Sequence, residues 1–236
     1  MAHPLLSENA GEKHLLLGNE AIVRGALEAG VEFVSCYPGT PSSEAPDTFF
    51  RLFGDPKGAE RFTFEYSVNE KVALEVAGGA ALGGLMTLCT MKHVGVNVAA
   101  DPLMTLAYIG APGGLVLLSA DDPGCHSSQN EQDNRYYARL GGIACFEPAT
   151  ADEAREMTKR ALLLFRRLER PVLLRTTTRV NHLRGPVTFA QLPDVNNKSE
   201  ELQPKEFEKN PRRFVPVPAF ARPMRQDLLK SLTTLK

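Results

Sequence analysis

Short runs of consecutive apolar residues alternate along this chain with longer amphipathic stretches, and this alternation most constrains the fold. The segment Leu115–Ala120 is apolar at nearly every position, whereas a strand with one wet face alternates apolar and polar residues. Such a strand is expected to be buried on both faces, as in a parallel sheet. The same reasoning predicts six strands: Glu32–Tyr37, Phe62–Glu65, Leu85–Met91, Leu115–Ala120, Ile143–Phe146 and Val172–Thr176.

Amphipathic stretches precede or separate these strands and are expected to be helical. They are Asn19–Ala29, Ser43–Phe53, Val68–Leu82, Val96–Ile109, Ser128–Leu140 and Ala151–Leu168. Thr150 and Glu153 have the spacing of a capping box at the start of the last helix, and Pro171 ends it. Regular alternation of strands and helices predicts an α/β fold, with a doubly wound, mainly parallel six-stranded sheet and helices on both faces.

The sequence changes character beyond about residue 180. Seven of the seventeen prolines lie between Pro186 and Pro223, and charged residues crowd into Lys198–Lys209. We therefore expect residues 1–180 to form the α/β domain. Residues 181–236 are expected to be a proline-rich, charged linker or surface extension with a short helix near Gln226–Leu232.

Charge and hydropathy argue against two classes of partner. The net charge is −1, which gives no electrostatic reason to expect nucleic acid or an anionic membrane. No apolar run reaches the length of a membrane-spanning helix, and no secretory signal precedes the first predicted helix. We expect a cytoplasmic protein. The four cysteines lack CxxC spacing, so no zinc or iron–sulfur site, and hence no metal site, is predicted in this chain.

Glu70 opens a predicted helix whose body, Val72–Ala81, consists mostly of small apolar residues. Ser67 and Glu70 have the spacing of a capping box, which by itself accounts for the glutamate. Capping does not account for Gly78 and Gly79, because two mid-helix glycines cost about 1.5–2 kcal/mol relative to alanine. A neighbouring helix or a second domain is therefore expected to approach this helix closely.

A proline-rich turn connects the first predicted strand to the next helix. It reads as an ordinary strand–turn–helix connection in which the prolines restrict the backbone and Ser42 caps the helix. It also lies at the carboxyl end of a predicted parallel strand, where open α/β sheets place their ligands. The turn runs Tyr37-Pro38-Gly39-Thr40-Pro41-Ser42-Ser43-Glu44.

Two polar segments are expected at the same edge of the sheet. Met91–Pro102 follows the third strand and contains a histidine that, taken alone, is a surface or helix-start residue. Asp121–Asp133 follows the fourth strand, and its polarity is also typical of a solvent-exposed loop. Candidates for ligand or subunit contacts in these segments are His93, Gly95, Asn97, Gln129, Asn130, Gln132 and Asp133.

Taken together, these segments resemble the 2-oxoacid:ferredoxin oxidoreductases, a family of thiamine diphosphate enzymes, and within it the indolepyruvate branch. The turn is similar to the family's Tyr-Pro-x-Thr-Pro-Ser-Ser motif. Asn69-Glu70-Lys71 and the small-residue helix are similar to the start of its pyrimidine-binding domain, and the similarity extends from Gly18 to Thr176. Members of this branch convert aryl pyruvates and coenzyme A to arylacetyl-CoA and carbon dioxide, and pass electrons to ferredoxin.

The resemblance implies roles for individual residues. Glu70 would hydrogen-bond the aminopyrimidine ring of thiamine diphosphate and promote the tautomer that deprotonates the thiazolium. The other coenzyme contacts would come from Pro38, Gly39, Gly95 and Asn97, and Gly39 would leave room for a bulky substrate. Thr40 would contact the carboxylate or keto oxygen of the substrate. The full set of implied substrate contacts is Tyr37, Thr40, Pro41, His93, Gln129 and Asn130.

The chain departs from the family by omission, since it has neither a Gly-Asp-Gly…Asn metal segment nor a CxxCxxCxxxC run. Mg²⁺ and iron–sulfur clusters are expected elsewhere in the full subunit. The implied partners are a diphosphate-binding domain, a beta or gamma subunit, ferredoxin, the 2-oxoacid and coenzyme A. A homodimer through the Ala73–Ala81 face is also expected. As an excised domain or a natural split subunit, the chain alone is expected to be inactive. A non-oxidative decarboxylase part and a non-catalytic assembly domain remain alternatives.

Overall fold

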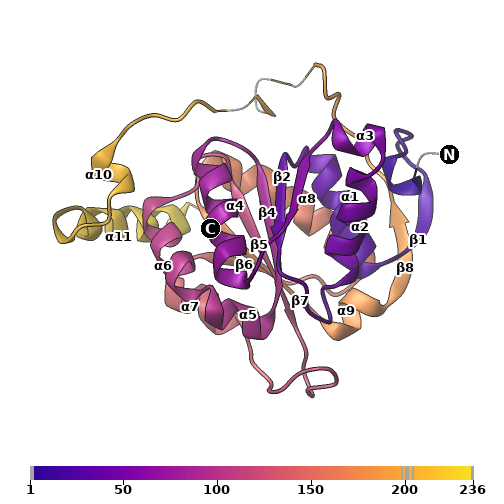
Figure 1. Cartoon of the computed structure of the whole chain (residues 1–236), viewed down its shortest axis with the longest axis horizontal. Coiled ribbons are helices and arrows are strands. Elements are labelled where there is room, and N and C mark those ends of the chain that lie inside the picture. The colour runs from indigo at the N-terminus through magenta and orange to yellow at the C-terminus, as the bar shows by residue number, and fades with distance from the viewer. Residues whose placement is uncertain (1–2, 198, 200–201, 204, 235–236) are drawn as a thin grey trace.

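The computed structural model describes residues 3–197, 199, 202–203 and 205–234. Its main sheet contains six strands in the order β3-β2-β4-β5-β7-β6, and every neighbouring pair is parallel (Figure 1). The sheet lies between two layers of helices, which confirms the predicted α/β fold and all six predicted strands. The strands are β2 Phe33–Cys36, β3 Thr63–Tyr66, β4 Thr87–Lys92, β5 Leu115–Asp121, β6 Ala144–Phe146 and β7 Pro171–Thr177.

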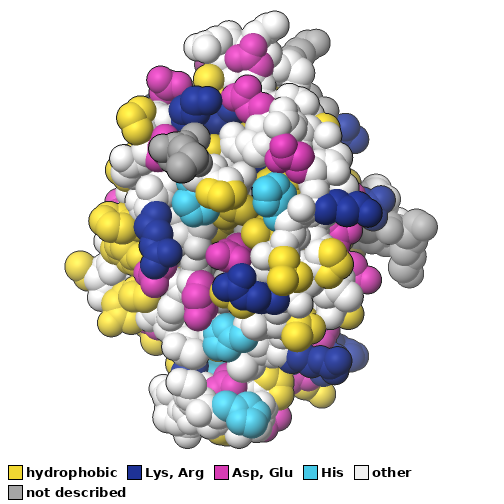
Figure 2. All heavy atoms as spheres, turned by 90° about the vertical axis from the view of Figure 1, so that its right-hand side faces the viewer, with side chains coloured by type: hydrophobic (Ala, Val, Ile, Leu, Met, Phe, Trp, Pro, Cys, Tyr) yellow, Lys and Arg dark blue, Asp and Glu magenta, His cyan; other side chains and the backbone are white. Residues whose placement is uncertain are grey.

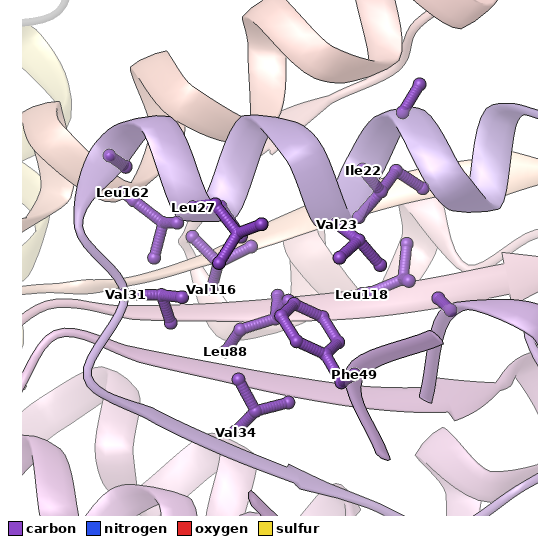
Figure 3. Packing of buried hydrophobic residues seen from close by; sticks show 14 of the residues in the cluster. Ile22, Val23, Leu27, Val31, Val34, Phe49, Leu88, Val116, Leu118 and Leu162 are labelled. Atoms are coloured by element: carbon purple, nitrogen blue, oxygen red, sulfur yellow. The ribbon is translucent and has the colours of Figure 1, made fainter. Parts of the chain in front are cut away.

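One helical layer contains α1 (Gly18–Ala29), α2 (Glu44–Phe53) and α8 (Ala151–Leu168). Figure 3 shows apolar side chains of α1 packed against those of β4 and β5 in this layer. Helices α1 and α8 touch through their backbones, because a Cβ built on Gly25 would lie 2.2 Å from the carbonyl oxygen of Arg155. Full burial of each large aliphatic side chain contributes about 1.5–3 kcal/mol.

The opposite layer contains α4 (Glu70–Leu82), α5 (His93–Val98), α6 (Ala100–Ile109) and α7 (Arg135–Gly141). The expected close approach to α4 is found at Gly78, where an added Cβ would lie 3.0 Å from two methyl carbons of Leu106 on α6. Gly79 is different, since a Cβ there would meet nothing within 4 Å. One face of α4 is therefore packed on its neighbour and another is open.

Two of the predicted helices differ from those observed. The predicted helix Val96–Ile109 is divided into α5 and α6, because Pro102 has no N–H to bond the carbonyl of Val98, where α5 ends. The predicted helix Ser128–Leu140 forms only from Arg135 onward. Its first half is a loop that is held by side-chain hydrogen bonds.

Among the described residues, two further strands lie outside the main sheet, and they were not predicted from the sequence. β1 (Lys13–Leu17) pairs antiparallel with β8 (Arg184–Thr188). Arg24 fixes the adjoining segments, because its fully buried guanidinium donates hydrogen bonds to the carbonyl oxygens of Leu5, Ser7 and Ala190. Short helical turns complete this half of the molecule: η1 Pro4–Leu6, α3 Pro56–Ala59 and α9 Thr178–His182.

The segment after residue 180 contains more regular structure than was predicted. Besides β8 it holds α10 (Pro211–Phe214) and α11 (Pro218–Thr233), the latter longer than the expected helix near Gln226–Leu232. Met224 and Leu228 of α11 are buried in the core on the α4–α7 side of the sheet. The boundary at residue 180 between domain and extension stays a prediction.

The molecular surface agrees with the balanced charge of the sequence. On the face shown in Figure 2, acidic and basic side chains are interspersed with apolar ones. Within the described ranges, none of the helices combines the length and apolar character that crossing a lipid bilayer requires.

Candidate active site at the carboxyl edge of the sheet

The carboxyl ends of all six parallel strands meet at one edge of the sheet, where α/β proteins place their ligands. Four connections lie there: the turn of residues 37–44 after β2, the start of α4 after β3, the start of α5 after β4 and the loop of residues 122–134 after β5. Each contains candidate residues predicted from the sequence. The parallel topology therefore brings these segments to one edge.

Glu70 is the first residue of α4, and this corrects the capping-box interpretation. The helix is capped by Asn69, whose side-chain oxygen accepts a hydrogen bond of 2.9 Å from the backbone N–H of Val72. Glu70 is therefore the first helical residue rather than the third, and Ser67, which is not the N-cap, forms no capping box with it. Its half-buried carboxylate makes no hydrogen bond or ion pair with any residue that the structure describes. It remains available to a ligand.

Gly95 of α5 is buried directly against Glu70. A Cβ built on this glycine would lie 2.4 Å from Cγ and 2.7 Å from Oε1 of Glu70, distances that real Cβ atoms do not show. The family resemblance implies that Gly95 contacts the coenzyme. In the structure, its missing side chain makes room for the glutamate itself. The position of the Glu70 carboxylate thus depends on a glycine in another helix.

His93 is fully buried at the start of α5, so it is a helix-start residue and the surface alternative is wrong. Its Nε2 lies 2.9 Å from the carbonyl oxygen of Asn130. Its Nδ1 is buried and has no hydrogen-bond partner among the described residues. The ring therefore connects α5 to the loop of residues 122–134 through the backbone of Asn130.

A buried polar network behind His93 was not predicted. Asn134 donates from its side chain to the carbonyl oxygen of His93 at 3.0 Å and to Oγ of Ser119 at 2.8 Å. Its backbone N–H donates to Asp121, which also accepts a 2.8 Å hydrogen bond from Nε of Arg175. Burial opposes the charge of Arg175, but the hydrogen bond and charge of Asp121 outweigh it and raise the pKa of the guanidinium.

The loop of residues 122–134 is anchored at its first residue. The carboxylate of Asp122 accepts hydrogen bonds from the backbone of Ser127 at 2.7 Å and from the hydroxyls of Ser128 and Thr178 at 2.5 and 2.8 Å. Burial works against the ionised form, but these hydrogen bonds prevail and hold the pKa of Asp122 below its ordinary range. Such local bonds compete with helix formation, which explains why the helix begins late. Gln129 and Asn130 are exposed on this loop.

Two buried asparagines hold the backbone of the turn of residues 37–44. The carbonyl oxygen of Pro41 accepts hydrogen bonds from the side-chain amides of Asn19 and Asn181 at 2.8 and 3.0 Å, and both asparagines are fully buried. Ser42 donates from Oγ to the carbonyl oxygen of Gly39 at 2.8 Å and does not cap α2, which begins at Glu44. Tyr37 and Pro38 are exposed, and Thr40 is half-buried.

Asn97 lies on the exposed side of α5, where its side-chain oxygen accepts a hydrogen bond from the hydroxyl of Tyr137 on α7. Asp133 pairs with Arg135 at 2.6 Å, and Gln132 bonds the side chain of Asn130 at 2.9 Å. Across the described ranges, no three or more His, Cys, Asp or Glu side chains are grouped so that they could hold a metal ion.

Comparison with known protein families decides which family the chain belongs to. Residues 24–229 match the family described as "Pyruvate flavodoxin/ferredoxin oxidoreductase, thiamine diP-bdg". The chain belongs to this family. The resemblance that the motifs indicated is confirmed.

Curated relatives in this family are long proteins. The chain is 46% identical over 236 residues to indolepyruvate oxidoreductase subunit IorA of Archaeoglobus fulgidus, which covers all of this chain and 37% of the relative. It is 49% identical over 232 residues to the protein of the same name from Methanothermobacter thermautotrophicus, covering 98% of this chain and 36% of the relative. The chain thus spans little more than a third of these proteins.

The fold is also found in a solved structure. A 2-oxoglutarate:ferredoxin oxidoreductase from Magnetococcus marinus, with 2-oxoglutarate, coenzyme A and succinyl-CoA bound, superposes with a TM-score of 0.74. The match covers 95% of this chain and 45% of that chain at 15% sequence identity. At this identity the likeness establishes the fold alone.

Proposed function

We propose that this chain supplies the pyrimidine side of the thiamine diphosphate site in a 2-oxoacid:ferredoxin oxidoreductase. The observation that carries the proposal is the Glu70 carboxylate, which has no described partner and lies against Gly95 at the carboxyl edge. The substrate is indolepyruvate or another aryl pyruvate, and the products are an acyl-CoA and carbon dioxide. The names of the relatives support this substrate class.

The residues present fit the coenzyme. Glu70 would hydrogen-bond the aminopyrimidine and exchange a proton with it, while the open surface of α4 at Gly79 would let a flat ring or a second domain come close. When bound, thiamine diphosphate supplies a carbon nucleophile and an electron sink. Asn97, Pro38 and Gly39 would flank it.

The substrate would occupy the space between the turn and the loop. Thr40 is held in place because Pro41 is bonded to two buried asparagines, so its hydroxyl would meet the carboxylate or keto oxygen in a fixed position. The remaining substrate contacts proposed are Tyr37, Pro41, His93, Gln129 and Asn130. Of these side chains, His93 is fully buried and lies against the backbone of Asn130, so it would support the loop that borders the substrate.

The metal, the diphosphate site and the electron carriers of the proposed reaction would lie outside this chain. Mg²⁺ and the diphosphate would be held by a further domain of the subunit, and iron–sulfur clusters would carry electrons to ferredoxin. A beta or gamma subunit, coenzyme A and a homodimer complete the proposed assembly, and the chain alone would be inactive. Location in the cytoplasm stays a prediction.

The test replaces Glu70 by glutamine in the full-length subunit within its complex. Because proton transfer by a positioned side chain contributes about 10²–10⁴-fold to rate, 2-oxoacid- and CoA-dependent ferredoxin reduction should fall by at least about 100-fold. Glu70→Asp should lose less. Unchanged ferredoxin reduction in Glu70→Gln would favour an assembly domain, and aldehyde release without ferredoxin by the unaltered complex would favour a non-oxidative decarboxylase.

A further inference from the structure

Lys92 bridges two of the segments that form the candidate site. It is the last residue of β4, between the turn that follows β2 and the loop that follows β5. Its stem packs on the turn, since a Cβ built on Gly39 would lie 2.9 Å from Cβ and 3.4 Å from Cδ of Lys92. Its ammonium donates a hydrogen bond to the carbonyl oxygen of Ser127 in the loop. The lysine therefore contacts both the turn and the loop.

The charge of Lys92 is not balanced within the described part of the chain. Lys71 pairs with Asp101 at 3.0 Å and Lys205 pairs with Glu169 at 2.7 Å, but Lys92 forms no ion pair with a described residue. One neutral carbonyl uses only part of the donor capacity of an ammonium. Since this side chain is half-buried, its partly desolvated charge favours an anionic ligand.

A second unpaired charge lies at the same edge. The Glu70 carboxylate is held against Gly95, three residues beyond Lys92, and the two charges do not pair with each other. Opposite charges that stay apart can serve two different groups. Glu70 is committed to the coenzyme in the proposed function, which leaves the cation for a negative group of the substrate.

We infer that the Lys92 ammonium binds the carboxylate of the 2-oxoacid substrate, an assignment that rests on the proposed function. The stem of Lys92 lies against Gly39, which precedes Thr40 in the turn, and its ammonium contacts the loop at Ser127. The position of Lys92 also accounts for the glycine at residue 39, because a larger residue there would displace the lysine.

The chemistry predicts which kinetic constant depends on this lysine. The substrate carboxylate loses its charge as carbon dioxide leaves, so an ion pair with it is strongest before decarboxylation. An interaction that is no stronger in the transition state lowers KM without raising kcat. Loss of the cation should therefore raise KM and leave kcat nearly unchanged.

The first experiment uses Lys92→Met, Lys92→Gln and Lys92→Arg in the full-length subunit within its complex. Methionine keeps an unbranched stem against Gly39 but removes the charge. Because hydrogen bonds to charged groups are stronger than those between neutral groups, KM for phenylpyruvate should rise about 10- to 100-fold in Lys92→Met and Lys92→Gln, with kcat within about threefold. Lys92→Arg should recover much of the affinity.

The charge control is Lys57→Met, since this exposed lysine lies on α3 at the opposite edge of the sheet. It changes the net charge by the same amount and should leave both constants unchanged. A fall in kcat with KM unaltered in the Lys92 variants would overturn the inference.

The second experiment needs no turnover and separates this inference from the proposed function. Phenylacetate and phenylacetamide are titrated into the thiamine-loaded complex by calorimetry. The acid should bind more tightly than the amide, and this advantage should vanish in Lys92→Met. An undiminished advantage overturns the inference, as does a loss of thiamine diphosphate affinity with acid binding unchanged. If the unaltered complex binds the acid through Lys92 but does not oxidise 2-oxoacids, only the proposed function fails.

Discussion

Two regions of this protein differ in whether their charged side chains form ion pairs within the chain. Between α1 and α8, the fully buried carboxylate of Glu28 pairs with Arg24 at 2.8 Å and with Arg155 at 2.7 Å. At the carboxyl edge, Glu70 and Lys92 form no ion pairs with described residues. The difference indicates that charges needed for the fold are balanced inside the chain, whereas unbalanced charges are available for ligands.

The largest expected effect is on the free energy of unfolding, when the buried ion pairs of Glu28 are broken. Glu28→Ala removes a carboxylate from between two buried guanidinium groups, and breaking a buried pair in this way costs about 3–5 kcal/mol. Glu70→Gln should change the free energy of unfolding by no more than about 0.5 kcal/mol, because no described partner is lost. Urea denaturation of both variants measures the contrast. Equal destabilisation would show that Glu70 is also required for the fold.

The next expected effect concerns the contact between Gly95 and Glu70 in the candidate site. Gly95→Ala places a methyl group where Glu70 now lies, so overpacking should cost about 1–3 kcal/mol and activity of the full complex should fall. The matched control is Gly79→Ala in α4, where the added methyl group meets nothing.

That control should stabilise the isolated chain by up to about 1 kcal/mol through helix propensity. Chemical denaturation is measured for both variants, and ferredoxin reduction is measured for Gly95→Ala in the full complex. A stable, fully active Gly95→Ala protein would contradict the view that this glycine positions the carboxylate.

The smallest expected effect concerns the loop that packs on the site. The folded state lowers the pKa of Asp122, so its stabilisation is present above its ordinary pKa of about 4 and is lost as the pH falls through the lower folded value. Asp122→Asn should therefore be less stable than the unaltered chain at neutral pH. This difference should shrink when denaturation is repeated below about pH 4. A difference independent of pH would mean that the charge of Asp122 is unimportant.

The elements that the sequence predicted well are those specified by local patterns. β5 is buried along all seven residues, as its run of apolar residues predicted. Once the sheet was predicted to be parallel, the turn at Thr40 and the helix at Glu70 had to lie at one edge. The family motif then supplied the candidate roles, which stay proposals for the individual residues.

The features that escaped prediction depend on contacts between distant segments. β1 and β8 pair although they are far apart in the sequence, and neither short strand has a distinctive residue pattern. Asn19 and Asn181 look like ordinary polar residues until folding buries both beneath Pro41. Arg175 ends up against Asp121 for the same reason. Polar residues whose partners are remote leave no periodic signal, so sequence patterns do not reveal them.

The guanidinium of Arg24 also has a consequence for how the chain is completed during synthesis. Its hydrogen bonds join residues near the N-terminus to the carbonyl oxygen of Ala190, and its partner Glu28 accepts a 2.7 Å hydrogen bond from the N–H of Ala190. A nascent chain that has emerged only through β7 lacks these bonds, although the entire parallel sheet is already present. The segment at Ala190, far outside that sheet, must therefore be synthesised before the first helix acquires these bonds.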